Sequence, residues 1–302
     1  MSTESTGTGA MSASTIHDIG YRNYEGRRAG RGYVLRSLYV HNLRAAWGIG
    51  RPARAKVMPF LLGAIMLLPA AGSVAVFAIS KEPDMLMRYA SYAPTLQVII
   101  AIFVATQAPV LASREIRFHV VPLYFSRPVG HLDFVLAKLG AMATALFALT
   151  AAPITVLYVG GLITKIPNSG RQLLDYLAGL VGCVLFALVL AAIGLVVAAF
   201  TPRRGFGVAA VIAVFMLSTA FVAIVQGLAE MRTEFALAGW AGLFTPFNLI
   251  DIVQVRLLGA QSSSIAIAPG VLGGAVALGV CAALVAGAVL VLYTRFRKAG
   301  LS

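Results

Sequence analysis

Few residues in this 302-residue chain have the type and spacing that chemistry requires. Glu115 and His119 are four residues apart, so on a helix they would share one face. A metal site needs further ligands, however, and none follows them at a suitable spacing. The chain contains no phosphate loop of the form GxxxxGKS or GxxxxGKT, no HExxH zinc motif and no GxSxG nucleophile elbow. We therefore expect no catalytic site, no metal and no cofactor in this chain, and we do not expect an enzyme.

The composition points to a membrane protein. Hydrophobic residues make up 59% of the chain and charged residues 12%, with a mean hydropathy of +0.87. Soluble domains have about 45–50% apolar and about 25% charged residues, so the expected solvent is the bilayer. The two cysteines, Cys183 and Cys281, lie within apolar runs, which favours core packing over a disulfide.

Six apolar stretches are long enough to cross a membrane, which takes about 20 residues of helix. Barrel strands would instead be about ten residues of alternating polarity. The predicted fold class is therefore an all-α membrane protein with six transmembrane helices, at residues 57–79, 93–112, 139–163, 173–200, 207–225 and 271–293.

The cores of these six stretches contain no ionisable residue. A proton- or sodium-coupled carrier would be expected to place carboxylates at mid-depth, so that class is disfavoured. Gln97 and Gln107 are polar but neutral and lie in the second stretch. They either form hydrogen bonds between helices or line a substrate path.

The distribution of charge predicts the orientation. Eighteen of the 24 Lys and Arg residues and five of the 11 acidic residues fall on one side of the six stretches, which gives that side the whole net charge of +13. Cytoplasmic loops collect Lys and Arg, so both termini are predicted to be cytoplasmic. We expect residues 1–30 to be a disordered cytoplasmic tail, because large apolar groups are few at its start, and residues 294–302 to be a short cytoplasmic tail.

The segment 31–56 precedes the first span and is predicted to be interfacial. Residues 32–47 place apolar side chains at spacings of three and four with Arg36, His41 and Arg44 between them, as in an amphipathic helix. Such a helix lies in the headgroup plane on anionic lipid, and its polar face is alternatively a contact for a cytoplasmic partner. Because this charge lies beside six spans, nucleic acid is not an expected partner.

A short helix is predicted in the loop between the second and third spans. Ser113 is a candidate N-cap with Glu115 in the first turn, and Pro122 and Pro128 then interrupt the backbone. Helical periodicity returns from Leu132. A short helix between two breaks, just outside the membrane, is a suitable lever for a docked protein.

The segment 226–270 before the last span is long for a connection. Thr245 and Pro246 predict the start of a helix that Gly259 ends, with an apolar stripe on one face. A second short helix is predicted at 230–240. The stripe consists of Leu249, Ile250, Val253 and Leu257.

The chain resembles the ABC-2 type permeases, the membrane subunits of ATP-binding cassette transporters, most of which are exporters. The motif after the second span is matched by Glu115, Ser126–Val129, His131, Asp133 and Lys138. The phrase Thr245-Pro246-Phe247-Asn248-Leu249 matches the segment that precedes the family's last span, with Thr for Ser. The resemblance covers the chain from about Arg31 onward.

This resemblance implies a dimer of permease subunits, with a second copy or a different subunit, on two ATP-binding cassette ATPase subunits that bind ATP and Mg. It implies a bacterial cytoplasmic membrane, a loop helix near 113–125 in a groove of the ATPase, and an external helical hairpin. The hairpin would place Trp240 and Phe247 at the outer leaflet as an anchor or exit gate. The implied coupling residues are Glu115, Arg117, Phe118 and Arg127, with Arg36 and Arg44 as secondary contacts.

Two functional hypotheses follow. The first is a permease subunit that exports a hydrophobic or amphipathic compound, or a peptide, powered by a separate ATPase. The alternative is a membrane scaffold or signal-transducing partner of such an ATPase, without transported cargo. A polytopic membrane enzyme is disfavoured because ionisable groups are missing from the spans.

Overall fold

The computed structural model describes residues 26, 30–80, 88–125, 129–164, 169–201, 203–260 and 270–301. These ranges are almost entirely helical and contain no strand. Arg127, together with the Ser126 and Pro128 beside it, lies outside the described residues, as does nearly all of the tail predicted at 1–30.

Within these described ranges, six helical segments are long and apolar enough to cross a membrane, which confirms the predicted number. Each contains most of one predicted stretch. The second segment joins α4 to the short helix after it, and its predicted first residues form a separate turn before α4. The long helices are α2 (Ala53–Ser80), α4 (Gln97–Leu111), α7 (His131–Ile163), α8 (Ser169–Phe200), α9 (Arg204–Met231) and α12 (Gly270–Leu301).

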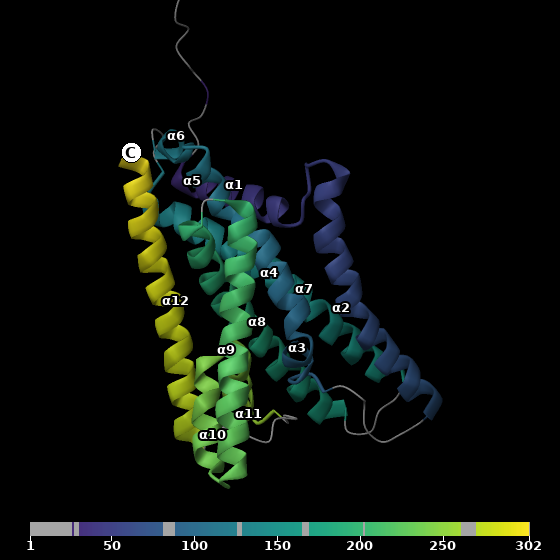
Figure 1. Cartoon of the computed structure of the whole chain (residues 1–302). Helices are drawn as coiled ribbons and strands as arrows, with labels where there is room; N and C mark the ends of the chain where they lie inside the picture. Colours follow the sequence, from purple (N-terminus) through teal and green to yellow (C-terminus); the bar gives the residue numbers. More distant parts are fainter. Residues whose placement is uncertain are drawn as a thin grey trace, which may run out of the picture.

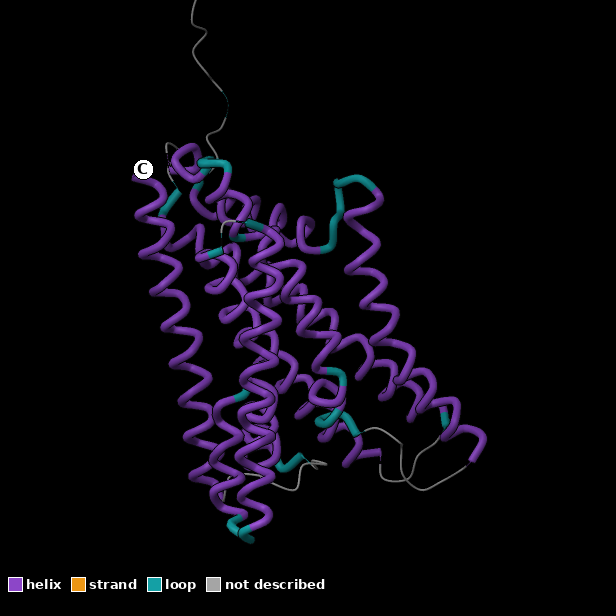
Figure 2. The backbone as a smooth tube through the Cα atoms, in the orientation of Figure 1, coloured by secondary structure: helices purple, strands orange, loops and turns teal. Residues whose placement is uncertain are grey.

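Shorter helices lie between and beside the long ones, and Figure 2 shows that few loop residues separate them. They are α1 (Arg31–Ala46), α3 (Tyr92–Thr95), α5 (Ser113–Arg117), α6 (Val121–Phe125), α10 (Phe235–Ala241), the 3-10 turn η1 (Gly242–Phe244) and α11 (Pro246–Leu258).

Three of the long helices form the centre of the bundle. In α4, α7 and α8 half or more of the most apolar window is buried, whereas α2, α9 and α12 bury less than a third. Apolar side chains exposed on the outer helices, such as Leu217 and Leu290, are those expected of a surface that faces lipid. The bundle therefore has an inner layer of three helices and an outer layer of three.

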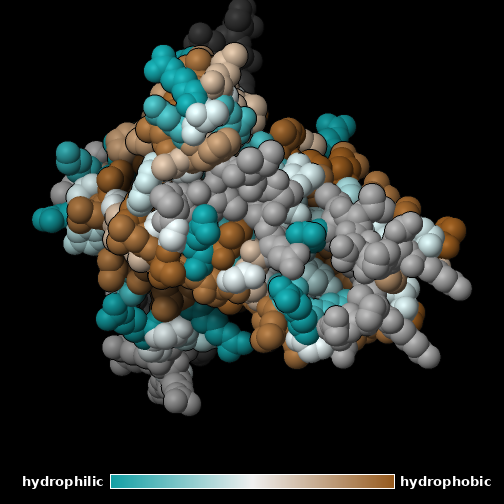
Figure 3. Space-filling view, turned by 90° about the horizontal axis from the view of Figure 1, so that it is seen from below, coloured by the Kyte–Doolittle hydropathy of each residue, from teal (hydrophilic) through white to brown (hydrophobic). Residues whose placement is uncertain are grey.

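The short helices lie at the two ends of this bundle (Figure 1). α1, α5, α6 and the last turns of α12 lie together at one end, which we call the basic end, while α10 and α11 lie at the opposite end. Figure 3 views the opposite end, where hydrophilic side chains are grouped in patches between hydrophobic ones.

The segment from α10 to α11 is a bent helical pair with a 120° angle between its halves. The predicted start and end of α11 are confirmed, with Pro246 as its first residue and Gly259 in the left-handed conformation at φ 68°. The helix predicted at 230–240 is wrong at its start, because α9 continues to Met231 and α10 begins at Phe235. Thr233, at φ 58°, forms the turn between them.

Gly182 allows α11 to approach α8 closely. A Cβ atom at Gly182 would lie 1.3 Å from Nε2 of Gln254, whose side chain is buried in α11. Gly279 in α12 has no atom within 4 Å of the corresponding position. The packing between helices therefore requires glycine at position 182 but not at position 279.

We expect Gly182→Ala to destabilise the protein by about 1–3 kcal/mol, the usual cost of overpacking, because Gln254 must leave its buried position. Gly279→Ala is the matched control and should be neutral or slightly stabilising, since Ala is the better helix former. Thermal unfolding in detergent measures both. Equal effects of the two substitutions would contradict the close approach of α11 to α8.

Candidate functional site

The densest set of polar interactions in the described residues lies at the basic end, where α4 stops and α7 begins. α4 ends at Leu111 and α5 starts two residues later, with Ala112 at φ −111° between them. A helix end leaves carbonyl groups without an intrahelical partner. The Leu111 carbonyl finds its donor in the Nζ of Lys138, which reaches it from α7.

Lys138 also forms a buried ion pair. Its Nζ lies 2.7 Å from Oε2 of Glu115 in α5, and its side chain is only 1% exposed. The ammonium lies 4.7 Å from the ring centroid of Phe134 and 5.9 Å from that of Phe296 in α12, a cation–π arrangement. One lysine therefore joins α4, α5, α7 and α12.

The helical periodicity predicted from Leu132 is confirmed, and the helix continues without a break into the stretch predicted as the third span. α7 begins at His131, directly after an extended Gly130, so Lys138 lies two turns inside the helix. The apolar residues on both sides of Lys138 in the sequence were the available signal for its burial. The carboxylate of Glu115, predicted to meet an ATPase, faces this lysine and is 14% exposed. Its role in coupling stays a prediction.

Two side chains from neighbouring helices satisfy the C-terminal carbonyls of α8. Ser113 Oγ donates a 2.5 Å hydrogen bond to the Ala198 carbonyl, and Arg295 Nε donates one of 3.3 Å to the Ala199 carbonyl. The prediction that Ser113 caps its own helix is therefore wrong, because its hydroxyl is directed to α8 instead. These bonds fix α5 and α12 to the end of α8.

A third connection attaches α1 to the start of α7. Arg31 donates two hydrogen bonds to the carboxylate of Asp133, at 2.6 and 2.8 Å, and Tyr39 donates one of 2.8 Å to Thr144. Asp133 lies in the first turn of α7, where the helix dipole favours an acidic side chain. The hydrogen bond and charge of Asp133 raise the pKa of Arg31 above its ordinary value. Because the Arg31 side chain is 75% exposed, water screens this pair.

The outer surface of α5 and the turn that follows it is basic and apolar. Arg114, Arg117, Phe118 and His119 are exposed, and the Arg117 guanidinium lies 5.6 Å from the centroid of the Phe118 ring. α5 ends before His119, which is at φ 51°, so Glu115 and His119 do not share a continuing helix. We call these four exposed residues the α5 surface. In the described ranges, no group of three or more His, Cys, Asp or Glu side chains could hold a metal ion.

α1 has one buried and one basic face. Asn42 and Ala46 are buried in its packing against the bundle, where α1 contacts α7 and α4. Arg36 and Arg44, the predicted secondary contacts, are exposed. α1 runs across the basic end rather than along the bundle (Figure 1), so its exposed arginines and the α5 surface are at the same end.

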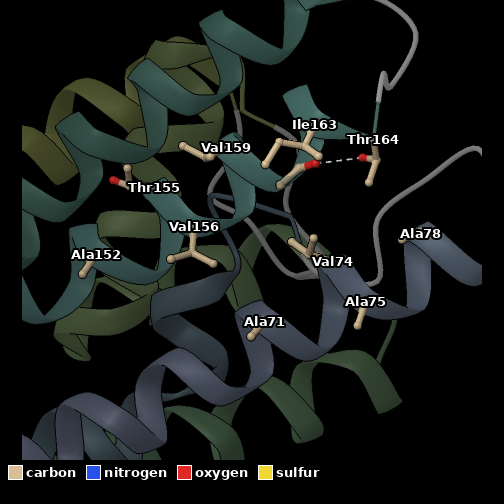
Figure 4. Close-up of a pocket in the computed structure, with 11 residues that line it drawn as sticks. Ala71, Val74, Ala75, Ala78, Ala152, Thr155, Val156, Val159, Ile163 and Thr164 are labelled. Atoms are coloured by element: carbon tan, nitrogen blue, oxygen red, sulfur yellow. Dashed lines mark hydrogen bonds between the residues drawn. The ribbon is translucent and has the colours of Figure 1, made fainter.

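An apolar groove of about 780 Å³ runs between α2 and α7 at their ends away from α1 (Figure 4). The hydroxyl groups of Thr155 and Thr164 donate to carbonyls of their own helix at 2.8 Å, so they add little polarity. We call this space the lateral groove; Ala71, Val74, Ala75, Ala78, Ala152, Thr155, Val156, Val159, Gly160, Ile163 and Thr164 line it.

A smaller cavity of about 270 Å³ lies between the same helices nearer the basic end. Ala152 lines both spaces, so they are neighbours along α7. We call it the basic-end pocket; Trp47, Phe60, Gly63, Ala64, Leu67, Ala148, Leu149 and Ala152 line it.

The two glutamines predicted for a substrate path line neither space. Gln97 is the half-buried first residue of α4. Gln107 is buried, and its amide donates a long hydrogen bond of 3.3 Å to Thr106 on the same helix. Their role in a substrate path stays a prediction, and the apolar groove was not found from the sequence.

The two aromatic residues predicted at the outer leaflet have different surroundings. Trp240 in α10 is half-buried. Phe247 is 1% exposed, with its ring 5.9 Å from that of Phe186 and 6.1 Å from that of Phe215. Its ring therefore packs within the bundle, and its role as anchor or gate stays a prediction.

A scan against models of known protein families finds no match for this chain, and a search of curated proteins finds no similar sequence.

Replacing Lys138 with Met should destabilise the protein by about 3 kcal/mol, because Glu115 loses its buried partner and the Leu111 carbonyl loses its donor. Adding Glu115→Gln should restore part of that loss, since the unpaired carboxylate disappears. Chemical unfolding in detergent gives both values. Lys298→Met, at an exposed lysine of α12, is the control and should change stability by less than about 0.5 kcal/mol. Additive effects of the two substitutions would contradict the ion pair.

Proposed function

We propose that this chain is the membrane subunit of an ATP-driven exporter, with the basic end in the cytoplasm. The chain has no phosphate loop, so ATP and Mg would bind to a separate ATP-binding cassette ATPase. The proposed assembly contains two permease subunits and two ATPase subunits in a bacterial cytoplasmic membrane.

The observation that carries this proposal is the way α5 is held. Its exposed side presents Arg114, Arg117 and Phe118, while its inner side is attached to the bundle through Glu115 and Ser113. A force applied to the exposed side would therefore reach α7 and α8, the two long helices that pack most extensively against each other. A basic and aromatic surface with this backing suits docking of an ATPase.

The orientation proposal rests on charge. Arg36 and Arg44 on α1, the α5 surface, and Arg297 and Lys298 on α12 are all exposed at the basic end. An excess of Lys and Arg is typical of cytoplasmic segments. The external hairpin of the proposal corresponds to the bent pair α10 and α11 at the opposite end.

The lateral groove supports an apolar or amphipathic cargo. Its lining is aliphatic apart from Thr155 and Thr164, whose hydroxyls are already bonded to α7. It opens on the outside of the bundle along α2, so a ligand dissolved in the bilayer could reach it without crossing water. A bare ion would find no charged ligand there among the lining residues.

We expect Arg117→Glu combined with Phe118→Ala to lower ATPase association and stimulated ATP hydrolysis by at least about tenfold, since a central aromatic and an arginine are removed from the docking surface. Co-purification with an ATP-binding cassette ATPase from the same organism, followed by hydrolysis measurements, tests this.

The matched control for docking is Arg232→Glu with Leu228→Ala, an exposed pair at the other end of the bundle. It should leave association unchanged. If the Arg117 and Phe118 variant binds and stimulates the ATPase normally, α5 is not the docking element. If the ATPase binds and cycles but no compound moves in any vesicle assay, the scaffold alternative replaces the exporter.

Filling the lateral groove with Ala75→Phe and Val156→Phe should slow ATP-driven uptake of hydrophobic dyes into inverted vesicles by roughly tenfold, as expected for misfit in an apolar pocket. ATPase association should stay intact because the groove lies at the ends of α2 and α7 away from the basic end, where α5 is. Val214→Phe with Leu217→Phe, on the exposed side of α9, is the control. Unchanged dye uptake in the filled variant would exclude the groove from the transport path.

A further inference from the structure

We infer that an anionic phospholipid binds in the elbow between α1 and α2, with its headgroup on Arg44, Arg54 and Lys56 and an acyl chain in the basic-end pocket. This inference does not rest on the proposed transport function. It comes from three features of the elbow: unbalanced positive charge, an adjacent cavity of matching polarity, and a turn that brings the two together.

The positive charge of the elbow has no counterpart within its own segment. The segment from Gly30 to Ser80 has no acidic residue, and its basic residues Arg44, Arg54 and Lys56 are exposed at the elbow. Of the acidic residues that the structure describes, those at the basic end are Glu115 and Asp133. Both are engaged elsewhere, with Lys138 and Arg31 respectively.

The turn between the helices brings the end of α1 against the start of α2. Gly48 is at φ 67°, and a Cβ atom there would lie 2.4 Å from the Ala55 carbonyl and 3.0 Å from the Lys56 nitrogen. Only glycine allows this contact. Lys56 is therefore held close to the last turn of α1, which carries Arg44 and leads into Trp47.

Two of the basic residues lie one helical turn from the aromatic residues that line the basic-end pocket. Arg44 precedes Trp47 by three residues, and Lys56 precedes Phe60 by four, so each pair shares a helical face. The rings of Trp47 and Phe60 lie 5.6 Å apart, and both residues line the basic-end pocket. A long basic side chain on a helix points toward the helix N-terminus, so Lys56 extends toward the headgroup level and away from the cavity.

From Phe60 the apolar lining of the basic-end pocket continues along α2 away from the basic residues. Residues 60, 63, 64 and 67 of α2 form one stripe at spacings of three and four, and all of them line the pocket. At 1.5 Å per residue, this stripe extends about 10 Å from Phe60, within one leaflet of a hydrocarbon core of about 30 Å. Cations above an apolar slot of this depth match a phospholipid with a negative headgroup.

The test uses the fact that the chain has two tryptophans, Trp47 and Trp240. With Trp240→Phe, fluorescence reports on Trp47 alone, inside the basic-end pocket. The full chain is reconstituted in equimolar phosphatidylcholine and phosphatidylglycerol, with bromine on the acyl chains of one or the other lipid. We expect brominated phosphatidylglycerol to quench Trp47 more strongly.

Neutralising the elbow with Arg54→Gln and Lys56→Gln should reduce this preference by about fivefold for each charge removed. Arg44 is left unchanged so that docking of an ATPase is not altered at the same time. The control, Arg171→Gln with Arg232→Gln, removes two exposed charges from the opposite end and should keep the preference. Gly63→Leu should lower quenching by both lipids, because the nearest atom to its Cβ position is 4.0 Å away and the new side chain fills the cavity.

Equal quenching by the two brominated lipids would overturn the inference, as would an equal loss of preference in the control. Competition by soluble glycerol phosphate would show that the elbow binds a free anion rather than a lipid, and would also overturn it. Failure of the transport proposal leaves all of these readouts unchanged, since none requires an ATPase or a cargo.

Discussion

The structure of the basic end depends on the interactions of one buried ammonium group, that of Lys138. A charge buried in a helical membrane bundle is costly unless hydrogen bonds and an opposite charge compensate it. Lys138 has both, through the Leu111 carbonyl and Glu115, and the rings of Phe134 and Phe296 enclose it. Because its partners belong to different helices, the charge is compensated only when the four helices are assembled.

The break between α4 and α5 becomes stable for the same reason. Carbonyls at the ends of α4 and α8 accept hydrogen bonds from Lys138, Ser113 and Arg295, each on a different helix. Away from the basic end, contacts depend on small residues instead: Gly160 approaches Val74, and Gly182 approaches Gln254. The basic end is therefore joined chiefly by directional polar bonds. Elsewhere helices approach closely at glycines, and hydrogen bonds such as that from Gln172 to Tyr89 add to this packing.

Much of the helical architecture follows from the sequence because span length and hydropathy are local properties. The six spans were predicted within a few residues at most ends, and α11 begins and ends where Pro246 and Gly259 indicate. Errors occur where a distant partner decides. Ser113 bonds α8 rather than its own helix, and Glu115, expected to face a partner protein, forms an ion pair with the buried Lys138 of α7.

The sequence by itself determined the membrane character of this protein, the six helices of membrane length in the described residues and the absence of a phosphate loop, since each depends on composition, run length or a contiguous motif. Tertiary structure alone decided which charges are paired and which are exposed. Glu115 and Asp133 are engaged within the bundle, whereas Arg117 and Lys56 face outward. It also decided where apolar cavities open beside α2. Pairing and cavity shape depend on residues far apart in the chain, whose approach is set by how the helices pack.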